Sequence, residues 1–369
     1  MHIDAVELRL LKLPLVRPFE TSFGRTDVRE FVLVRVDGEG EVGWGECVAD
    51  EHPFYSSETT VTEWYILRDY LVPRLLGVRF DHPGAILPAV ADIRGHRMAK
   101  AAIEMAMWDL FARQRRQPLS VLLGGVRTEI ASGVSIGIQP SLEDLAERIA
   151  EELAAGYRRI KIKVKPGWDV EAVAFVRDRF GGVPLMVDAN AAYTLADAPM
   201  LAALDRFDLM MIEQPLDEED IQDHARLQAQ VATPVCLDES IVSAHRAEEA
   251  IALGACRVVN IKPGRVGGHA ESIRVHDVCA AHGVPVWHGG MLETGIGRMH
   301  NVHLASLSNF SLPGDIAASR RYFRPDLVEP EVTVRADGTI AVPRSPGLGV
   351  EIIEDRISRA TLETLTLRA

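Results

Sequence analysis

The chain has 369 residues, of which 47% are hydrophobic and 25% charged, and it carries a formal net charge of −13 at pH 7. This length predicts two domains rather than one small core. The acidic balance argues against nucleic acid and anionic membranes as partners. No uninterrupted apolar stretch approaches the roughly 18 residues that a membrane-spanning helix needs.

The cysteines and the first residues bear on the cellular compartment. The four cysteines show no spacing typical of a zinc site: Cys47, Cys236, Cys256 and Cys279. The opening residues MHIDAVELRLL lack the basic start, the apolar stretch and the cleavage site of a secretion signal. We therefore expect a cytoplasmic protein with reduced thiols.

The first 126 residues predict an α+β domain. Three segments have the composition of β-strands: 6–13, 29–36 and 42–48. A largely helical pattern follows, and segment 99–114 predicts an amphipathic helix. We expect its buried face to carry Ile103, Ala106, Met107 and Leu110.

Eight repeats of a short apolar run and a helical pattern come next. The runs cover residues 131–138, 159–164, 185–190, 209–215, 235–240, 258–263, 284–290 and 311–316. Such a rhythm is typical of a parallel β/α barrel. After it, segments 333–342 and 356–367 predict further β-structure. We expect a capping domain over residues 1–126, completed by 320–369, and a barrel over residues 127–319.

Polar residues end these predicted strands at even intervals. Seven of them follow one another every 24 to 27 residues: Ser135, Lys161, Asp188, Glu213, Asp238, Lys262 and His288. The C-terminal ends of barrel strands point into one shared mouth, where barrel enzymes carry their catalytic residues. Three carboxylates gathered there need a counter-charge, which a hard divalent cation supplies. We expect Asp188, Glu213 and Asp238 to bind a metal ion; pairing with the lysines alone is the competing interpretation.

Lysines flank the three acids. Lys161 and Lys163 share one strand and one face, because side chains alternate with period two, and Lys262 ends a strand across the barrel. A second ammonium group and a dication lower the pKa of a lysine, as a general base requires. With an amine on each side of a metal-bound carboxylate, an α-proton is removed from one face and returned to the other, which is racemisation. Expulsion of a leaving group from the β-carbon is the other outcome.

Six motifs, in this order, resemble the enolase superfamily: KIKVKPG, VDAN, IEQP, LDES, NIKPGRVGG and GGMLETGIG. The Lys161-x-Lys163 pair and Lys262 make the chain similar to the muconate-lactonising subgroup, and to its branch of N-acylamino acid (N-succinylamino acid) racemases and o-succinylbenzoate synthases. The resemblance covers essentially the whole chain. It implies an α/β fold with a modified (β/α)7β TIM barrel beneath an α+β capping domain.

The resemblance also implies roles for single residues. Asp188, Glu213 and Asp238 become the metal ligands, and Lys163 and Lys262 the acid/base pair on opposite faces. The residues around them that contact the substrate or orient these groups are Lys161, Asn190, Glu239 and Arg265. Among these, Arg265 accompanies racemase-type members three residues after the second base; a surface salt bridge is its alternative interpretation.

Specificity residues are less clearly marked. Segment 18–26 is similar to the capping-domain loop that closes over substrate. We expect apolar walls of the substrate pocket from Phe19, Phe23 and Tyr55, and further contacts from Ser135 and Met291. Each of the aromatic residues also suits core packing.

Two departures refine the expectation. Dipeptide epimerases of this superfamily carry Asp-x-Asp at the eighth strand to hold a free ammonium group, and here the string is Gly-Asp315-Ile-Ala. The missing second acid favours a substrate with an acylated nitrogen. His288 lies where the mandelate racemase branch has a catalytic histidine, but Lys262 occupies the place of that histidine's aspartate partner. We therefore expect His288 to be a pocket or structural residue.

The predicted function is divalent-metal-dependent racemisation of N-acylamino acids, with Mg²⁺ (or Mn²⁺ or Co²⁺) as the cofactor, N-succinyl compounds as preferred substrates and o-succinylbenzoate synthase activity in the same site. The synthase of menaquinone biosynthesis as the sole role is the alternative, followed by a dipeptide epimerase and a non-catalytic scaffold. The partners we expect are a small carboxylate substrate and further copies of the chain in a homo-oligomer.

Overall fold

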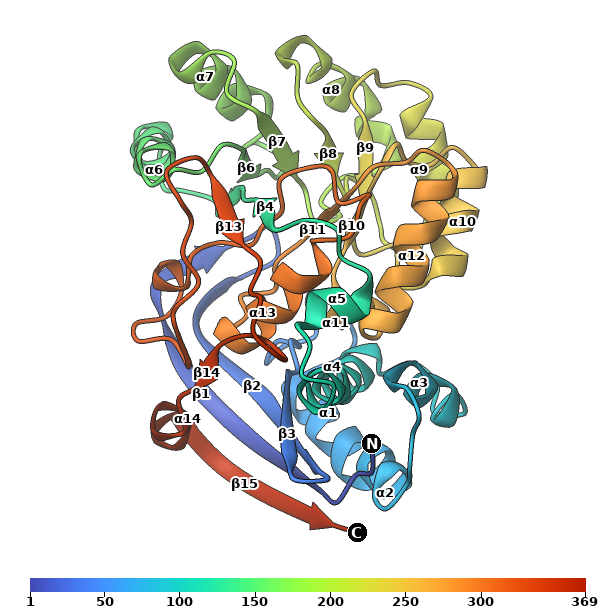
Figure 1. The fold of residues 1–369 in the computed structure, drawn as a ribbon. Coiled ribbons are helices and arrows are strands. Elements are labelled where there is room, and N and C mark those ends of the chain that lie inside the picture. The colour runs from blue at the N-terminus through green and yellow to red at the C-terminus, as the bar shows by residue number, and fades with distance from the viewer.

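A four-stranded antiparallel sheet forms the lower part of the molecule as seen in Figure 1, in the computed structural model, which describes residues 1–369. Its strands are β1 (Ala5–Glu20), β2 (Arg25–Gly38), β3 (Glu41–Glu46) and β15 (Thr361–Arg368). Their order is β15-β1-β2-β3, so the last strand of the chain pairs with the first. The three predicted N-terminal strands are confirmed, as is the return of the C-terminus to them.

Strand β2 is buried on both faces over residues 31–34, whereas β15 at the edge of the sheet has no buried residue. In β2, Val32, Val34 and Val36 point to one face and join a core formed with the neighbouring helices. Phe31 and Leu33 point to the other face and join the large core of the barrel side. We call this sheet and the helices between β3 and residue 114 the cap. Those helices are α1 (Thr60–Ile66), the π-helix η1 (Leu67–Leu71), α2 (Val72–Leu75), the 3-10 helix η2 (Pro83–Ala85), α3 (Ile86–Ala89) and α4 (Arg97–Gln114).

Helix α4 lies between the cap sheet and the barrel. Its existence is confirmed, but the prediction of one buried face is wrong: from Met98 to Ala112 every residue except Lys100 is buried. The helix packs against β3 on one side and against α11 (Pro263–Val266) of the barrel on another. A helix enclosed in this way loses the polar stripe from which an exposed helix is recognised.

Strand β3 approaches α4 so closely that it needs glycine. A methyl group at Gly45 would lie 2.0 Å from the carbonyl oxygen of Ala102. We expect Gly45→Ala to lower the free energy of unfolding by about 1–3 kcal/mol, the usual cost of overpacking. Urea denaturation measures it, with Gly182→Ala as the control, because nothing lies within 4 Å of a methyl group there. Equal unfolding free energies for the two variants would contradict this packing.

Glu104 on α4 caps α12 (His269–Ala281). Its carboxylate accepts hydrogen bonds from the backbone nitrogens of His269 (2.8 Å) and Ala270 (2.9 Å) and from Trp108 Nε1 (2.6 Å). Burial nevertheless raises the pKa of Glu104 from 4.5 to about 7.

A pH-dependent contribution to stability follows for Glu104. Because the folded chain keeps this proton where the unfolded chain has lost it, stability falls as pH rises from 4.5 to 7. Glu104→Gln removes the titration. We expect the unfolding free energy of the wild type, relative to the variant, to fall by about 3 kcal/mol over this window. Urea denaturation of both proteins between pH 4.5 and 7.5 checks it; parallel pH profiles would contradict it.

Seven parallel strands form the second sheet, in the order β11-β10-β9-β8-β7-β6-β5. They are β5 (Val134–Ile136), β6 (Ile160–Lys163), β7 (Leu185–Asp188), β8 (Ile212–Glu213), β9 (Val235–Leu237), β10 (Val258–Ile261) and β11 (Val286–His288). Every residue in them is buried, which explains their continuous apolar runs. The first seven predicted barrel strands are therefore confirmed, with shorter bounds.

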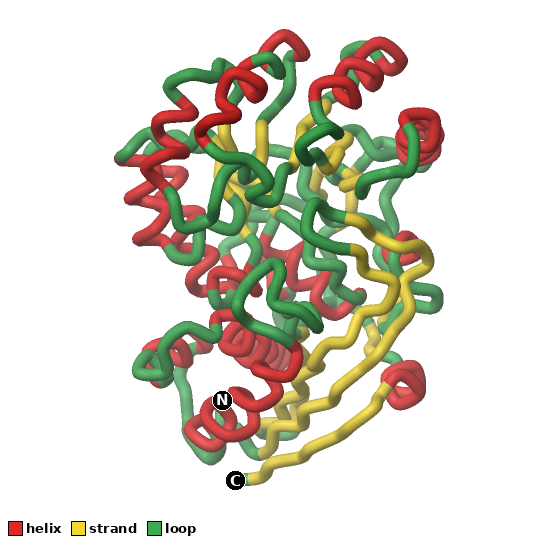
Figure 2. Tube along the Cα trace, turned by 180° about the vertical axis from the view of Figure 1, so that it is seen from behind, coloured by secondary structure: helices red, strands yellow, loops and turns green.

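Helices surround this sheet on the outside, and Figure 2 shows the same arrangement from behind. They are α6 (Leu142–Ala154), α7 (Val170–Phe180), α8 (Ala198–Ala202), α9 (Ile221–Gln228), α10 (Ala244–Ala252), α12 and α13 (Gly295–Leu304), with the short α5 (Leu119–Leu123) before the barrel. The 3-10 helices η3 (Leu195–Asp197), η4 (Asp205–Phe207) and η5 (Ser319–Arg321) lie in the connections. None of the helices is both long and apolar enough to cross a membrane.

The predicted eighth strand, 311–316, does not form a regular strand. Only single bridges remain, between Val286 and Phe310 and between Ser132 and Gly314. Pro313 lacks a backbone N–H and cannot donate to a ladder, so regular pairing stops there. The segment still closes the barrel, because Gly133 N donates to Gly314 O at 2.7 Å and Asp315 N donates to His288 O at 2.7 Å.

The C-terminal part is less regular than predicted. β12 (Val328–Glu329) pairs with β14 (Glu351–Ile352), and β13 (Thr339–Ala341) pairs with β4 (Glu129–Ala131). Residues 356–360, predicted as β-structure, belong to α14 (Glu354–Ala360), and the strand begins only at β15. The domain boundaries at 126/127 and 319/320 stay a prediction.

Candidate active site

The register of the parallel sheet brings the three acids and the lysines to one end. Lys163 stands opposite Asp188, and Asp188 opposite Glu213, in the pairing of β6, β7 and β8. Asp238 follows the last residue of β9, and Lys262 follows the last residue of β10. In the sheet, the strands of the three acids therefore stand between the strands of the two lysines.

Lys161 joins two of the acids. Its Nζ donates to Asp188 Oδ2 at 2.9 Å and to Glu213 Oε2 at 2.8 Å, and it lies 2.7 Å from Asp315 Oδ2. Burial alone would lower the pKa of Lys161, but the charges of these three carboxylates outweigh burial and raise it well above its ordinary value. These carboxylates therefore favour the protonated form of Lys161.

Lys163 contacts the same carboxylate oxygen of Asp188 as Lys161 does. Its Nζ donates to Asp188 Oδ2 at 2.7 Å and to Asn190 Oδ1 at 2.5 Å. Asn190 Nδ2 donates in turn to Glu239 Oε1 at 2.8 Å, and Glu239 Oε2 is buried without a partner. Burial and the charge of Asp238 raise the pKa of Glu239 to about 7. The structure thus brings the predicted rim residues next to Lys163.

Lys262 is held at Asp238. Its Nζ donates to Asp238 Oδ2 at 2.6 Å and to the hydroxyl of Tyr55 at 3.1 Å, and that hydroxyl donates to Asp238 Oδ1 at 3.0 Å. Arg265 Nη1 donates to the same carboxylate, and Arg265 Nε donates to Ile241 O at 2.8 Å. Arg265 is buried, so its interpretation as an exposed surface salt bridge is wrong. Tyr55 lies in the connection between β3 and α1 and reaches the barrel site through its hydroxyl. Its expected role as an apolar wall of the substrate pocket stays a prediction.

Carboxylate oxygens are ligands that suit a hard divalent cation. The structure contains no group of three His, Cys, Asp or Glu side chains close enough to hold one ion, and Asp188, Glu213 and Asp238 accept hydrogen bonds from lysine ammonium groups. Burial and the charges of Asp188 and Asp238 together raise the pKa of Glu213 well above its ordinary value. The three carboxylates therefore interact strongly, and a dication would relieve their repulsion. Metal ligation by Asp188, Glu213 and Asp238 stays a prediction.

Three polar or aromatic residues at this site escaped the sequence analysis as site residues. Asp315 is held by Arg159 Nη1 at 2.6 Å and by Lys161, and its position at the end of the eighth apolar run could have marked it. Asn260 Nδ2 donates to Glu213 Oε1 at 2.6 Å. The residue stands two positions before Lys262, so strand alternation could have found it.

Trp287 is the third residue that the sequence analysis missed. It precedes His288 on β11, and the pairing of β11 with β10 shows which face of the strand each of the two side chains occupies. The Nζ of Lys161 lies 4.9 Å from the centroid of the Trp287 ring. Asn260 pairs with Trp287 and Ile261 with His288, so His288 lies on the strand face opposite to Asn260. Burial lowers the pKa of His288 to about 4, and its ring stacks on Phe310 at 6.0 Å. These observations agree with the expected structural role of His288.

The predicted specificity residues do not gather in one pocket. Ser135 is the buried middle residue of β5 and has an unpartnered Oγ. Phe19 lines one cavity and Phe23 another, beside Phe54 of the cap. Met291 belongs to the hydrophobic core of the cap. Their substrate contacts stay predictions.

Comparisons with known families agree with this architecture. Residues 5–124 match the mandelate racemase / muconate lactonizing enzyme N-terminal domain, and residues 144–356 match the enolase C-terminal domain-like family. The o-succinylbenzoate synthase of Geobacillus kaustophilus is 53% identical to this chain, covering 98% of the chain and 96% of the relative. The N-succinylamino acid racemase of an Amycolatopsis species is 52% identical, covering 98% of both chains.

Solved structures give the same result. An enolase superfamily member from Listeria innocua is similar with a TM-score of 0.96 at 38% sequence identity, covering 100% of this chain and 99% of that one. The N-succinyl Arg/Lys racemase from Bacillus cereus has a TM-score of 0.92 at 27% identity and covers 100% of both chains. With family models that span both the cap and the barrel, the chain belongs to the enolase superfamily.

Proposed function

We propose that the chain is a divalent-metal-dependent racemase of N-acylamino acids, N-succinylamino acids in particular, and that the same site carries o-succinylbenzoate synthase activity. The observation that carries this proposal is the position of Lys163 and Lys262 on either side of the strands that bear the acids. Relatives named for the two activities are 53% and 52% identical to the chain, which supports one site for both.

The chain's own groups account for binding and proton transfer. A bound Mg²⁺ ion, the metal that we propose, supplies a Lewis acid that holds the substrate carboxylate and stabilises the charge left by α-proton removal. Lys161 adds a fixed positive charge to that carboxylate. Lys163 removes the α-proton from one antipode while Lys262 delivers a proton to the opposite face, and the other antipode reverses the roles.

Lys262 can act as a base only when Asp238 no longer pairs with it, as would happen if Asp238 bound the metal ion. Burial lowers the pKa of Lys262, but the carboxylate of Asp238 raises it further and leaves it above the ordinary value. Metal ligation by Asp238 would remove that partner and add positive charge nearby, and both changes would lower the pKa of Lys262. The positive charge of Arg265, which is buried against Asp238, also lowers the pKa of Lys262.

The nitrogen of the substrate is acylated in this proposal. A free ammonium group needs an unengaged acid near the eighth strand position. Asp315 is the acid there, and it already pairs with Arg159 and Lys161. The unpartnered Oγ of Ser135, next to β6 in the sheet, is instead free to donate a hydrogen bond to an acyl oxygen.

A substrate panel tests the proposal. Purified Mg²⁺-loaded protein is assayed with N-succinyl, N-acetyl and free dipeptide forms of one amino acid, and with the cyclohexadiene substrate of the synthase. We expect the highest kcat/KM among the amino acid derivatives for the N-succinyl form and turnover of the cyclohexadiene. Activity with the dipeptide alone would contradict the acyl assignment, and turnover of the cyclohexadiene alone would support the synthase as the sole role.

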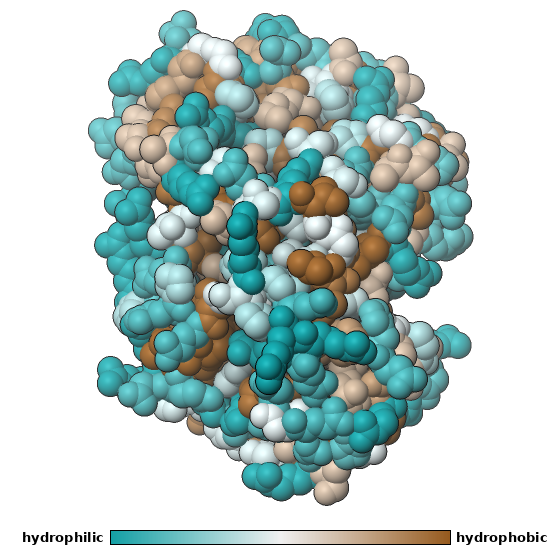
Figure 3. Space-filling view, viewed as in Figure 1, coloured by the Kyte–Doolittle hydropathy of each residue, from teal (hydrophilic) through white to brown (hydrophobic).

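Assembly and location belong to the same proposal. We propose a homo-oligomer in the cytoplasm, acting on a small carboxylate. Hydrophilic side chains dominate the face seen in Figure 3, and apolar ones gather in small patches; exposed valines include Val121 and Val126. Light scattering of the purified protein measures the number of subunits.

A further inference from the structure

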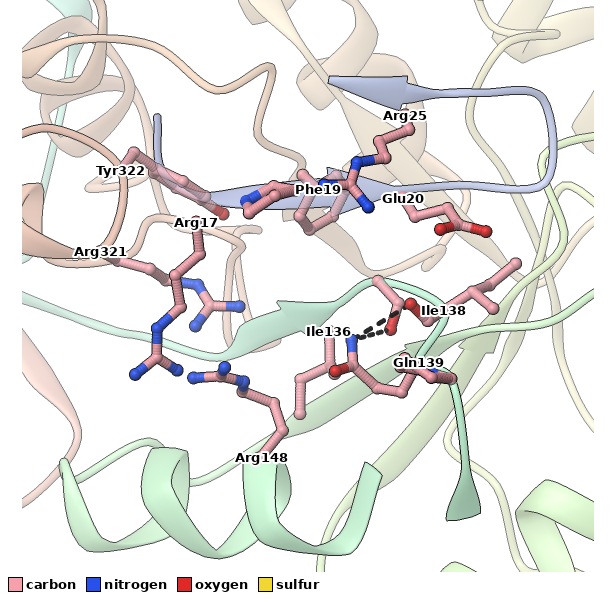
Figure 4. A pocket seen from close by; sticks show the side chains of 13 residues that line it. Arg17, Phe19, Glu20, Arg25, Ile136, Ile138, Gln139, Arg148, Arg321 and Tyr322 are labelled. Atoms are coloured by element: carbon pink, nitrogen blue, oxygen red, sulfur yellow. Dashed lines mark hydrogen bonds between the residues drawn. The ribbon is translucent and has the colours of Figure 1, made fainter. Parts of the chain in front are cut away.

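A second cavity, of about 260 Å³, lies apart from the acids and lysines, where three parts of the chain meet. The end of β1, the β5–α6 connection with α6, and the residues around η5 line it (Figure 4). Arginines dominate its charged lining: Arg17, Arg25, Arg148 and Arg321, against Glu20 as the one lining acid. The chain as a whole has a net charge of −13, so a cluster of four arginines stands out against its acidic composition.

Three of these arginines point into the same space. In Figure 4 the guanidinium groups of Arg17, Arg148 and Arg321 face one another across the opening. Arg17 and Arg148 share a single acceptor, Glu151 Oε2, at 3.0 and 2.5 Å. One carboxylate oxygen therefore serves two cations, and N–H groups of both remain available.

Arg321 is held more firmly. Its Nη2 donates to the carbonyl oxygen of Ser135 at 2.6 Å, its Nη1 pairs with Glu152, and its Nε is buried without a partner. The side chain is only 15% exposed. A buried guanidinium in a fixed position is already oriented for a further acceptor.

We propose that this cavity binds a small oxyanion. Planar guanidinium forks match tetrahedral and carboxylate oxyanions in geometry and charge, and the three arginines carry one positive charge more than Glu151 and Glu152, which pair with them. The size of the cavity limits the ligand to a small molecule, and the acidic surface elsewhere disfavours a polyanion. No hydrogen bond or ion pair joins Arg17, Arg148 or Arg321 to the acids or lysines of the barrel site, and Arg321 reaches Ser135 only through its backbone carbonyl oxygen.

Oxyanion binding connects the end of β1 to the barrel. Arg17 belongs to β1, Arg148 to α6 and Arg321 to η5, so one ligand bridges all three elements. Glu20, next to Phe19 in the same lining, already accepts a hydrogen bond through its carbonyl oxygen from Ile138 N at 3.0 Å. The ligand therefore stabilises the docked position of the segment that is similar to a substrate-covering loop, and it lowers the KM of the enzyme.

Calorimetric titration of the Mg²⁺-loaded protein with sulfate, and then with phosphate, tests the site. Chloride at equal ionic strength controls for screening. The variant is Arg148→Met, and its matched control is Arg226→Met, because Arg226 pairs with Asp223 at the same i,i+3 spacing on another barrel helix. We expect sulfate binding in the wild type, an affinity about tenfold weaker in Arg148→Met, and no change in Arg226→Met. Circular dichroism verifies that both variants fold.

Three results would overturn the proposal. The first is the absence of sulfate binding beyond that of chloride, and the second is equal affinity in Arg148→Met and the wild type, which would place the anion in the catalytic site. The third is a rise in KM for N-succinyl but not N-acetyl substrates in Arg148→Met without added oxyanion, since the arginines would then bind the tail of the substrate. The first two results come from binding alone, so they leave the racemase activity of the proposed function untouched.

Discussion

Lys163→Ala and Lys262→Ala should each lower kcat for racemisation by at least about 10²- to 10⁴-fold, the usual contribution of a general acid or base. The reason is that inversion needs one group to take the proton and another to return it on the opposite face. Polarimetry with an N-succinylamino acid measures the rate. The lysine that serves as a matched control is Lys165, which lies two residues beyond β6 and has a side chain that is 41% exposed.

The lysine variants must remain folded for this result to count. Lys165→Ala should keep nearly full activity, and circular dichroism and urea unfolding of all three variants exclude a loss of structure. Full activity in either Lys163→Ala or Lys262→Ala would refute the two-base account.

Glu213→Gln should weaken Mg²⁺ binding by about 100-fold or more and abolish activity at ordinary magnesium concentrations, because it removes the central one of the three carboxylates. Metal is first removed with a chelator, and Mg²⁺ is then titrated back in a calorimeter. Glu218→Gln, at an exposed position five residues further along the chain, is the control. Unchanged Mg²⁺ affinity in Glu213→Gln would contradict the metal assignment.

The barrel and its polar strand ends could be predicted because two simple periods specify them. Alternation with period two puts Lys161 and Lys163 on one face, and the recurrence of strands aligns Asp188, Glu213 and Asp238 across neighbouring strands. Both rules depend on backbone geometry alone. They need no knowledge of how side chains pack.

The remaining features depend on tertiary contacts that a sequence pattern does not encode. Helix α4 is buried on every side because the cap sheet and the barrel enclose it. The eighth apolar run forms only isolated bridges and no regular strand around Pro313. Asp315 is recognisable as part of the site only when its pairing with Arg159 and Lys161 is seen.

Segment 18–26 also depends on tertiary contacts that the sequence pattern does not encode. Phe19 and Phe23 are four residues apart and are both predicted as apolar walls of the substrate pocket, but they line different cavities. Phe19 belongs to β1, whereas Phe23 lies in the connection between β1 and β2. The arginine cavity likewise draws on three segments that are distant in the sequence.

The central claim is that Lys163 and Lys262 exchange the α-proton on opposite faces of one bound substrate. Exchange of the α-proton in deuterated water, followed by NMR for each antipode separately, tests it most directly. We expect Lys163→Ala to lose exchange with one antipode and retain it with the other, and Lys262→Ala to show the reverse. Equal exchange of both antipodes by Lys163→Ala would contradict the claim.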